Sequence, residues 1–390
     1  MNRVWLLVAL TLGLVAGAAG ALALQTDPPD PAPTRALPVR EVALPQPSGR
    51  VLLVWTHGGL PSGLAAGITH LDGVGAVTEV HGDDVGLVQS ADAAGRVVDA
   101  TRPGWTIPLD AMAFDPATYP AFVPEQSRPL FAGLRPGQAI LGATSARVRR
   151  LGPGGVLQLA GGRRLTVAAV VDDAVVGAAE LVVSTADPAA TAWPARYLLV
   201  NTTSTTVGVE KVTQGLLSPG TPVRFRLAGE TPFLREGDAV LPQALIKDRF
   251  GEFAFRDLTG RDIEVDPAWV SAHIVTADVP ILGRVTCHRA VIGAVRAALT
   301  DLLKSNLASL VDPAAFAGCF AAKRINPGEP VSRHAWGVAL DVNYRGNQTG
   351  VSSAQDPRLV AVMAHYGFTS GADWLQPDPA HFEYIRPARL

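Results

Sequence analysis

The chain has 390 residues, a formal net charge of −2 and two cysteines. That length allows two folded domains in addition to a leader. The near-neutral charge gives no sign of a nucleic-acid partner, because phosphate binding needs a concentrated basic face.

Residues 1–24 are interpreted as a targeting segment. Arg3 carries a positive charge, and residues 4–24 follow without a charged side chain. As a helix this run would be about 31 Å long, close to the roughly 30 Å of a bilayer core. A cleaved signal peptide has a shorter apolar core and a small-residue cleavage site, which residues 21–23 could supply. An uncleaved anchor that attaches the chain to the membrane and a cleaved leader both stay open, with length favouring the anchor. Either one places the rest of the chain outside the cytoplasm.

Residues 25–50 are dense in proline, which favours extended polyproline II structure and a semi-rigid spacer. The next segment, residues 51–237, is predicted to be a β-rich α+β extracytoplasmic domain. Its apolar runs predict a helix at 60–71 and strands at 51–55, 73–80, 85–88, 156–159 and 165–168, the last two joined as a hairpin at Gly161-Gly162.

One stretch of this domain, residues 140–151 followed by the hairpin, resembles the extracytoplasmic domains of MacB- and FtsX-type transporter permeases. The resemblance implies a binding or positioning module rather than a second enzyme. Arg147, Arg149 and Arg150 in the same stretch alternate with apolar Val148 and Leu151, which predicts a solvated helix face. Contact with an anionic wall polymer is the alternative.

Residues 238–390 are predicted to form a second α+β domain. A strand is expected at 250–255, a turn or short helix from Asp266, and amphipathic helices at 289–303 and 359–366. Cys287 and Cys319 lie on either side of the first of these helices. In an oxidising compartment a lone pair of cysteines favours one disulfide, with two free buried thiols as the alternative.

Two short motifs in this domain carry the chemistry. His334 and Asp341 are seven residues apart, and a loop that turns at Gly337 into a strand would bring both side chains to one place. Further on, His381 supplies a second imidazole and Asp378, three residues before it, another carboxylate. Two imidazoles and one carboxylate make a three-ligand zinc site with an open fourth position, which is the catalytic arrangement. The remaining carboxylate is then free to act as a base.

The motifs also carry a family resemblance. Ser-x-His-x-x-Gly-x-Ala-x-Asp at 332–341 followed by Asp-x-x-His-Phe-Glu at 378–383 resembles the VanY-type D-alanyl-D-alanine peptidases, zinc enzymes that cut bacterial cell-wall peptides. The sequence is most similar to the subgroup that includes L-alanyl-D-glutamate endopeptidases of phage lysins. The resemblance covers roughly residues 239–390 and implies a hedgehog-like α+β domain.

By this resemblance the zinc ligands are His334, Asp341 and His381, and the general base is Asp378. Arg324 falls where the family carries an arginine that holds a carboxylate or carbonyl oxygen of the substrate. The resemblance therefore implies Zn²⁺ as cofactor and the stem peptides of peptidoglycan as substrate.

Two further residues are expected near the substrate. Ser332 lies two residues before a ligand, where it could hydrogen-bond the substrate terminus or only cap the turn. Trp374 is a plausible wall residue, although residues 370–374 read Ser-Gly-Ala-Asp-Trp where the family usually has Trp-Gly-Gly-Asp-Trp. That departure concerns the shape of the substrate groove rather than the metal.

The leading interpretation is a D-alanyl-D-alanine carboxypeptidase-like enzyme of the bacterial cell envelope. An endopeptidase of the L-alanyl-D-glutamate type and a non-catalytic zinc-containing binding module are the alternatives.

Overall fold

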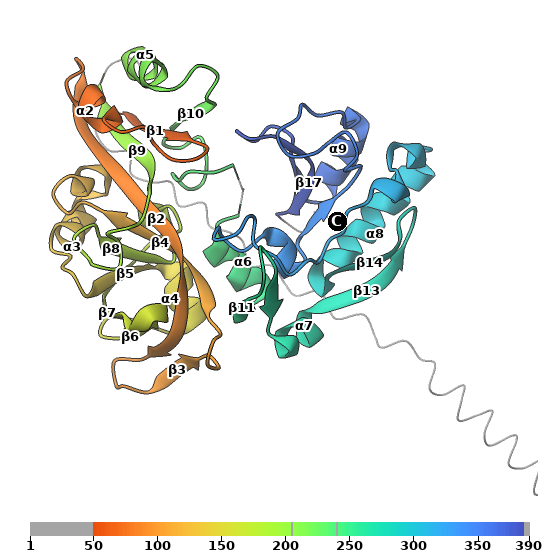
Figure 1. Ribbon diagram of the computed structural model, residues 1–390, viewed down its shortest axis with the longest axis horizontal. Helices are drawn as coiled ribbons and strands as arrows, with labels where there is room; N and C mark the ends of the chain where they lie inside the picture. Colours follow the sequence, from red (N-terminus) through yellow and green to blue (C-terminus); the bar gives the residue numbers. More distant parts are fainter. Residues whose placement is uncertain (1–49, 204–205, 239–240, 386–390) are drawn as a thin grey trace, which may run out of the picture. The chain divides into compact units, whose positions relative to one another are not determined.

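The computed structural model describes residues 50–203, 206–238 and 241–385 (Figure 1). The chain divides into two compact units, residues 1–43 and 44–390, and every described residue belongs to the second. The predicted leader lies outside the described residues, as does all but the last residue of the proline-rich linker. Among the described helices, none is long and apolar enough to cross a membrane. The predicted domain boundary at residue 238 falls inside the second unit and stays a prediction.

A ten-stranded sheet is built from residues 50–227. Its strands are β1 (Arg50–Thr56), β2 (Val74–Ala91), β3 (Val97–Ala100), β4 (Ile107–Phe114), β5 (Gln138–Gly142), β6 (Val156–Leu159), β7 (Arg164–Val171), β8 (Leu181–Ser184), β9 (Ala195–Thr202) and β10 (Val223–Leu227). The order is β10-β1-β9-β2-β4-β8-β5-β7-β6, and β6 also pairs with β2. This last pairing closes the run from β2 to β6 into a ring, which removes free strand edges there.

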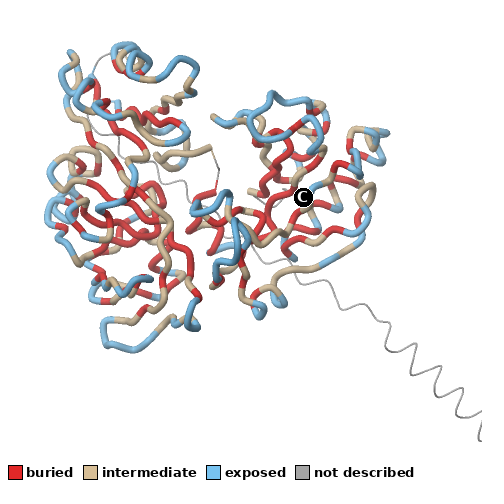
Figure 2. The backbone as a smooth tube through the Cα atoms, in the orientation of Figure 1, coloured by how far each residue is buried: buried red, intermediate tan, exposed pale blue. Residues whose placement is uncertain are grey.

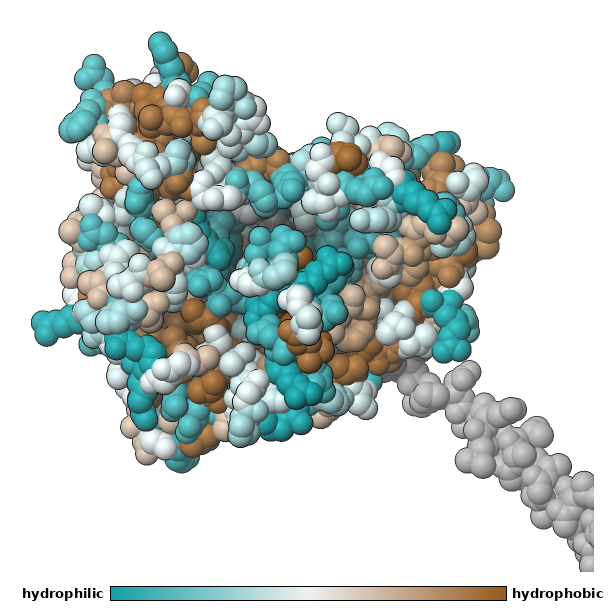
Figure 3. Space-filling model, viewed as in Figure 1, coloured by the Kyte–Doolittle hydropathy of each residue, from teal (hydrophilic) through white to brown (hydrophobic). Residues whose placement is uncertain are grey.

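Four short helices accompany this sheet, namely α2 (Leu64–Thr69), α3 (Arg128–Ala132), α4 (Ala143–Arg149) and α5 (Val207–Leu216). Helices α2 and α5 share one apolar cluster with β1 and β9. The residues of β1, β4, β5, β8 and β9 are mostly buried, whereas those of the long β2 are mostly intermediate (Figure 2). On the face drawn in Figure 3, apolar side chains gather near α5, where Val207 and Leu216 are exposed.

Most of the predicted elements of this region are present, with two differences. The strand at 51–55, the helix within 60–71 and the hairpin of β6 and β7 are confirmed. Strands 73–80 and 85–88, however, are one continuous strand, β2. Residues 82–84 are paired with β4, so their backbone groups are satisfied without a turn. Gly82 fits because a Cβ there would lie 3.0 Å from Ala111 O and from the Arg196 side chain.

The second difference concerns the arginines of α4. Arg147 and Arg150 are exposed as predicted, but the prediction of a solvated face is wrong for Arg149, which is fully buried. Its Nη2 lies 3.1 Å from Glu180 Oε1 and 2.5 Å from Glu252 Oε2. Lys247 Nζ lies 2.9 and 3.1 Å from the same two carboxylates. Burial of these charges is tolerable because each one is paired.

Residues 241–385 form smaller sheets with helices around them. The elements are α6 (Gln243–Phe250), β11 (Phe255–Asp257), β12 (Ile263–Val265), α7 (Pro267–His273), β13 (Ile274–Val279), β14 (Gly283–His288), α8 (Arg289–Lys304), β15 (Ala339–Asp341), α9 (Pro357–His365), β16 (Phe368–Gly371) and β17 (Asp378–Tyr384). The sheets are β11-β12, β13-β14 and β15-β17-β16, all antiparallel. Both regions thus mix helices and strands, which confirms a mixed α/β architecture; a hedgehog-like fold stays a prediction.

Both predicted helices of this region are present as α8 and α9, and the short helix after Asp266 is α7. The disulfide between Cys287 and Cys319 is also present. The expected strand at 250–255 is wrong, because α6 continues to Phe250 and β11 begins only at Phe255. The alternating aromatic side chains of this segment reflect a helix end and a loop packed into one core cluster.

Candidate metal centre

The two motifs meet on the sheet β15-β17-β16. Asp341 ends β15 and lies directly opposite His381 of β17 in the antiparallel register. His334 lies in a short 3-10 turn, Arg333–Trp336, that ends at Gly337 with a left-handed φ of 66°. A side chain at Gly337 would lie 2.6 Å from His288 N, so only glycine allows this approach. The predicted path, a loop that turns at Gly337 into a strand ending at Asp341, is confirmed.

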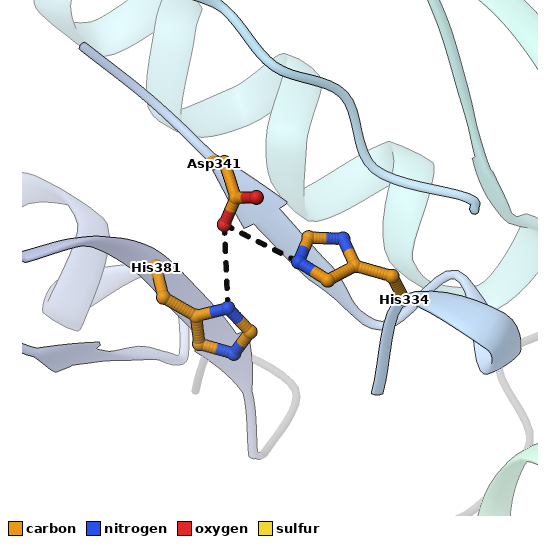
Figure 4. Close-up of side chains that lie close together, drawn as sticks. All are labelled: His334, Asp341 and His381. Carbon is orange, nitrogen blue, oxygen red and sulfur yellow. Dashed lines mark ion pairs between the residues drawn. The ribbon is translucent and has the colours of Figure 1, made fainter. Parts of the chain in front are cut away.

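One carboxylate oxygen joins the two imidazoles (Figure 4). His334 Nε2 lies 3.2 Å and His381 Nδ1 3.3 Å from Asp341 Oδ1. One ligand atom from each of the three residues lies within 4.8 Å of the others. In a tetrahedral zinc site with bonds of about 2.0–2.1 Å, neighbouring ligand atoms are separated by about 3.3 Å. Two of the separations match that value, so the donor set fits zinc.

The outer nitrogen of His334 supports this arrangement. Its Nδ1 lies 2.8 Å from the backbone oxygen of Cys319, so the Nδ1–H donates to a carbonyl. This bond leaves the lone pair of Nε2 directed at the position between the three side chains, which is how histidine ligands are oriented in metal sites. Because Cys319 is tied to Cys287, the disulfide anchors the carbonyl that orients the ligand.

The outer nitrogen of His381 faces Glu383, a residue that the sequence analysis did not single out. Glu383 is fully buried, with Oε2 3.9 Å from His381 Nε2 and Oε1 3.6 Å from Arg333 Nε. Neither of its oxygens, nor His381 Nε2, has a hydrogen-bond partner among the described residues. A buried carboxylate that has ion-pair contacts but no hydrogen bond is costly. A cation held at His381 Nδ1 would offset that cost, because it polarises the Nε2–H toward Glu383.

The spacing His381-x-Glu383 is the sequence signal that could have found this carboxylate. Side chains two residues apart on a strand point to the same face, and both residues lie on β17.

The charges of the cluster follow from burial and mutual contact. Burial opposes ionisation of Asp341, but the close contacts with the imidazoles of His334 and His381 outweigh it and hold the pKa of this carboxyl well below its usual range. Burial likewise opposes the imidazolium of His381, yet the carboxylates of Asp341 and Glu383 raise its pKa to about 9. Both shifts favour the charged forms of these side chains, a carboxylate at Asp341 and an imidazolium at His381.

Asp378 begins β17 and is half-buried, outside the three-residue cluster. Burial raises its pKa, an effect that the nearby His381 and a hydrogen bond with Thr349 only partly offset, while the charge of Asp341 adds to the rise. A raised pKa of this kind is common among acid–base groups but is also found at structural positions, and the role of Asp378 as general base stays a prediction.

Arg324 makes a two-point contact with another residue of the chain. Its Nε and Nη2 lie 2.6 and 3.0 Å from the two carboxylate oxygens of Asp257, and its Nη1 donates to the backbone oxygen of Glu329 at 2.8 Å. Among the described hydrogen bonds and ion pairs, none joins Arg324 to the three clustered residues. A substrate carboxylate would have to take the place of Asp257, whose side chain is 59% exposed. The substrate-binding role of Arg324 stays a prediction.

The two remaining predicted residues lie next to the cluster. The hydroxyl of Ser332 accepts a hydrogen bond from the backbone N–H of His334 at 3.4 Å, which is the turn-capping contact. The ring of Trp374 lies against that of His381, with centroids 5.1 Å apart. Trp374 thus contacts one of the three clustered residues, and its role as a wall of the substrate groove stays a prediction.

Comparison with known proteins supports the family resemblance. Residues 326–384 match the family described as D-alanyl-D-alanine carboxypeptidase, which confirms the resemblance read from the motifs. No curated protein matches the chain.

Two solved structures are similar to part of the chain. One is the periplasmic region of MacB from Actinobacillus actinomycetemcomitans, with 11% identity, a TM-score of 0.30, and coverage of 45% of this chain and 87% of that one. The other is the extracellular domain of the noncanonic ABC-type transporter YknZ from Gram-positive bacteria, with 11% identity, a TM-score of 0.30, and coverage of 46% and 100%. At these TM-scores the likeness supports no conclusion about this chain, and the transporter-domain resemblance stays a prediction.

Proposed function

We propose, on the premise that residues 326–384 match the D-alanyl-D-alanine carboxypeptidase family, that this chain is a zinc-dependent peptidase acting on peptidoglycan stem peptides. The observation that supports the proposal most is the shared Asp341 oxygen, with a histidine nitrogen 3.2 Å away on one side and 3.3 Å away on the other. A half-buried carboxylate with a raised pKa, Asp378, stands beside this cluster.

His334, Asp341 and His381 would hold the zinc ion. Bound zinc supplies Lewis-acid chemistry, which polarises a scissile carbonyl and makes water more acidic. Asp378 accepts the proton of the attacking water and passes it to the leaving amine. Its raised pKa makes Asp378 a stronger base than an ordinary carboxylate, which favours the first of these two proton transfers.

The surrounding residues orient these groups. The carbonyl of Cys319 orients the His334 ring by a hydrogen bond, and the carboxylate of Glu383 faces the outer nitrogen of His381 at 3.9 Å. Glu383 also brings negative charge behind His381, and it shares that charge with Arg333 on its other side. Arg324 is the proposed clamp for a substrate carboxylate or carbonyl oxygen, in exchange for its contact with Asp257.

We place the enzyme outside the cytoplasm, in the bacterial cell envelope. The disulfide between Cys287 and Cys319 supports this location, because disulfides persist in oxidising compartments. A D-alanyl-D-alanine carboxypeptidase is the leading activity, and cleavage of an internal L-alanyl-D-glutamate bond is the nearer alternative. A binding module that holds zinc without catalysis is the alternative from another class.

The test combines metal analysis with turnover of purified muropeptides by the full chain. Asp378→Asn keeps the size of the side chain and lies outside the cluster, so zinc should stay while kcat/KM falls at least about a hundredfold. His334→Ala and His381→Ala should lose both zinc and activity. Asp278→Asn, the same change at an exposed position of β13, is the matched control and should change neither.

Each alternative has its own result. Release of free D-alanine identifies the carboxypeptidase, and shortened peptides without it identify the endopeptidase. Stoichiometric zinc with no cleavage of any muropeptide by the unaltered protein would favour the binding module. Stoichiometric zinc in both histidine variants would refute the metal site itself, and near-normal turnover by Asp378→Asn would show that another group accepts the proton.

A further inference from the structure

The segment that carries Trp374 connects β16 to β17, and we name residues 371–377 the Trp374 loop. The backbone N–H of Trp374 donates to Gly371 O at 3.2 Å, which makes a tight turn. A Cβ at Gly371 would lie 2.6 Å from Asp378 O and 3.2 Å from the Trp374 ring. The loop therefore packs closely against the residues at which it leaves β16 and enters β17. This fold places the Trp374 ring against the ligand His381.

Both neighbours of Trp374 are held by residues far away in the sequence. Arg224 of β10 donates from Nη2 to the backbone oxygen of Asp373 at 3.0 Å. The carboxylate of Asp238 accepts the backbone N–H of Leu375. Arg224 Nη1 also lies 2.9 Å from Asp238 Oδ1, so the two form one ion pair. The pair therefore binds the loop on each side of Trp374. Arg224 and Asp373 are 149 residues apart in the sequence, and Asp238 and Leu375 are 137 residues apart.

The Trp374 loop is also held by apolar packing next to these polar contacts. The side chain of Leu375 packs against a core cluster that includes Val51 and Tyr197 of the large sheet. Only 7% of the Asp238 side chain is exposed, and Arg226 Nη2 lies 3.4 Å from Oδ1, the same oxygen that Arg224 contacts. Hydrogen bonds that involve a charged partner in such surroundings are about twice as strong as neutral ones. The loop is therefore held by the β10 region and not only by its own turn.

We infer that Arg224 and Asp238 are positioning residues of the metal centre, which act through Trp374 to set the wall beside His381. The inference rests on the proposed function for its substrate. It gives residues 50–238 a role in the site, since the ion pair belongs to the segment that precedes the matched family region. Loss of the pair frees the Trp374 loop without touching the three ligands, so substrate binding weakens while zinc stays.

The first measurement needs no substrate. Hydrogen exchange followed by mass spectrometry reports the protection of the Trp374 loop in the full chain. In Arg224→Ala the amides of residues 373–375 should exchange about tenfold faster, as expected for the loss of a charge-assisted contact. Arg224 is 35% exposed, so the substitution leaves the core intact, and Asp238→Asn should give the same direction of change. Arg96→Ala, which removes an exposed arginine paired with Asp92, is the control and should leave the loop unchanged.

The second measurement is a mutant cycle on muropeptide turnover. Arg224→Ala should raise KM about tenfold or more at unchanged zinc content, because small displacements of a site wall are costly. In a Trp374→Ala background, Arg224→Ala should add almost nothing, because its effect passes through the missing ring. If Arg224 had only a structural role, Arg224→Ala would raise KM by the same factor with and without Trp374.

Unchanged exchange of the Trp374 loop in both Arg224→Ala and Asp238→Asn overturns the inference. Faster exchange with unchanged KM overturns it as well, because the wall would then not matter to substrate. If the unaltered protein cleaves no muropeptide, the proposed function fails. The exchange measurement on Arg224→Ala and Asp238→Asn is still decisive then, because faster exchange shows that the ion pair holds the loop and unchanged exchange shows that it does not.

Discussion

The buried arginine of α4 allows a sharp test of the packing described above. Arg149→Met removes the guanidinium and keeps a similar length of side chain in a site with no exposure to solvent. Glu180 and Glu252 would each lose a partner and keep Lys247. Breaking a buried pair from one side typically costs about 3–5 kcal/mol, because a charge stays buried without its partner.

Two features place the expected loss at the lower end of that range. Lys247 still contacts both carboxylates, and two nitrogens of Arg149, Nε and Nη1, have no hydrogen-bond partner among the described residues. Some of the desolvation cost of Arg149 is therefore already uncompensated. We expect about 3 kcal/mol, which at an unfolding entropy of about 2.1 cal/mol/K per residue corresponds to a decrease in Tm of about 4 °C for a compact unit of this length.

Arg147→Met is the matched control. It is the same substitution two residues away on the same helix, but the Arg147 side chain is 59% exposed and pairs with Asp248 at the surface. Surface ion pairs contribute about 0–1 kcal/mol, so this variant should stay close to the unaltered protein. Urea unfolding and thermal unfolding, each at fixed zinc concentration, measure both. A loss below about 1 kcal/mol for Arg149→Met, or equal losses for the two variants, would refute the argument.

Three further predictions concern the site and its surroundings. Glu383→Gln should weaken zinc binding about 10–100-fold, as metal titration would show, because it removes the charge behind His381; unchanged affinity would contradict that role. Burial raises the pKa of Asp84 to about 7 from an ordinary 3.8. Between about pH 4 and pH 7 the folded protein therefore keeps a proton that the unfolded chain has released, so the free energy of unfolding falls as pH rises through this range. Asp84→Asn should remove that fall, seen as a gain over the unaltered protein of up to about 4 kcal/mol above pH 7 and none below pH 4; a pH-independent difference would contradict it. Opening the disulfide with Cys287→Ser and Cys319→Ser should cost about 4 kcal/mol by loop entropy and also lower zinc affinity through the Cys319 carbonyl; a loss of stability with unchanged zinc affinity would limit the disulfide to a structural role.

The metal centre is the part of this protein that local sequence determines most completely. His334 and Asp341 are joined by a short turn and one strand, and the glycine at the turn is required by the close approach of His288 N. His381 reaches the same place because β17 pairs antiparallel with β15 and puts His381 directly opposite Asp341. Residue spacing predicts short-range geometry of this kind. It predicts the amphipathic helix α8 and the hairpin of β6 and β7 in the same way.

Tertiary structure decided what surrounds the centre. Periodicity describes a helix face but not what packs on it, so the sequence could not separate buried Arg149 from exposed Arg147 two residues away. The partners Glu180 and Glu252 come from segments 31 and 103 residues distant. Arg224 meets the Trp374 loop across a still longer separation. The environment of a charge depends on which distant backbone and side chains exclude water from it, and that is set only when the sheets and helices have packed.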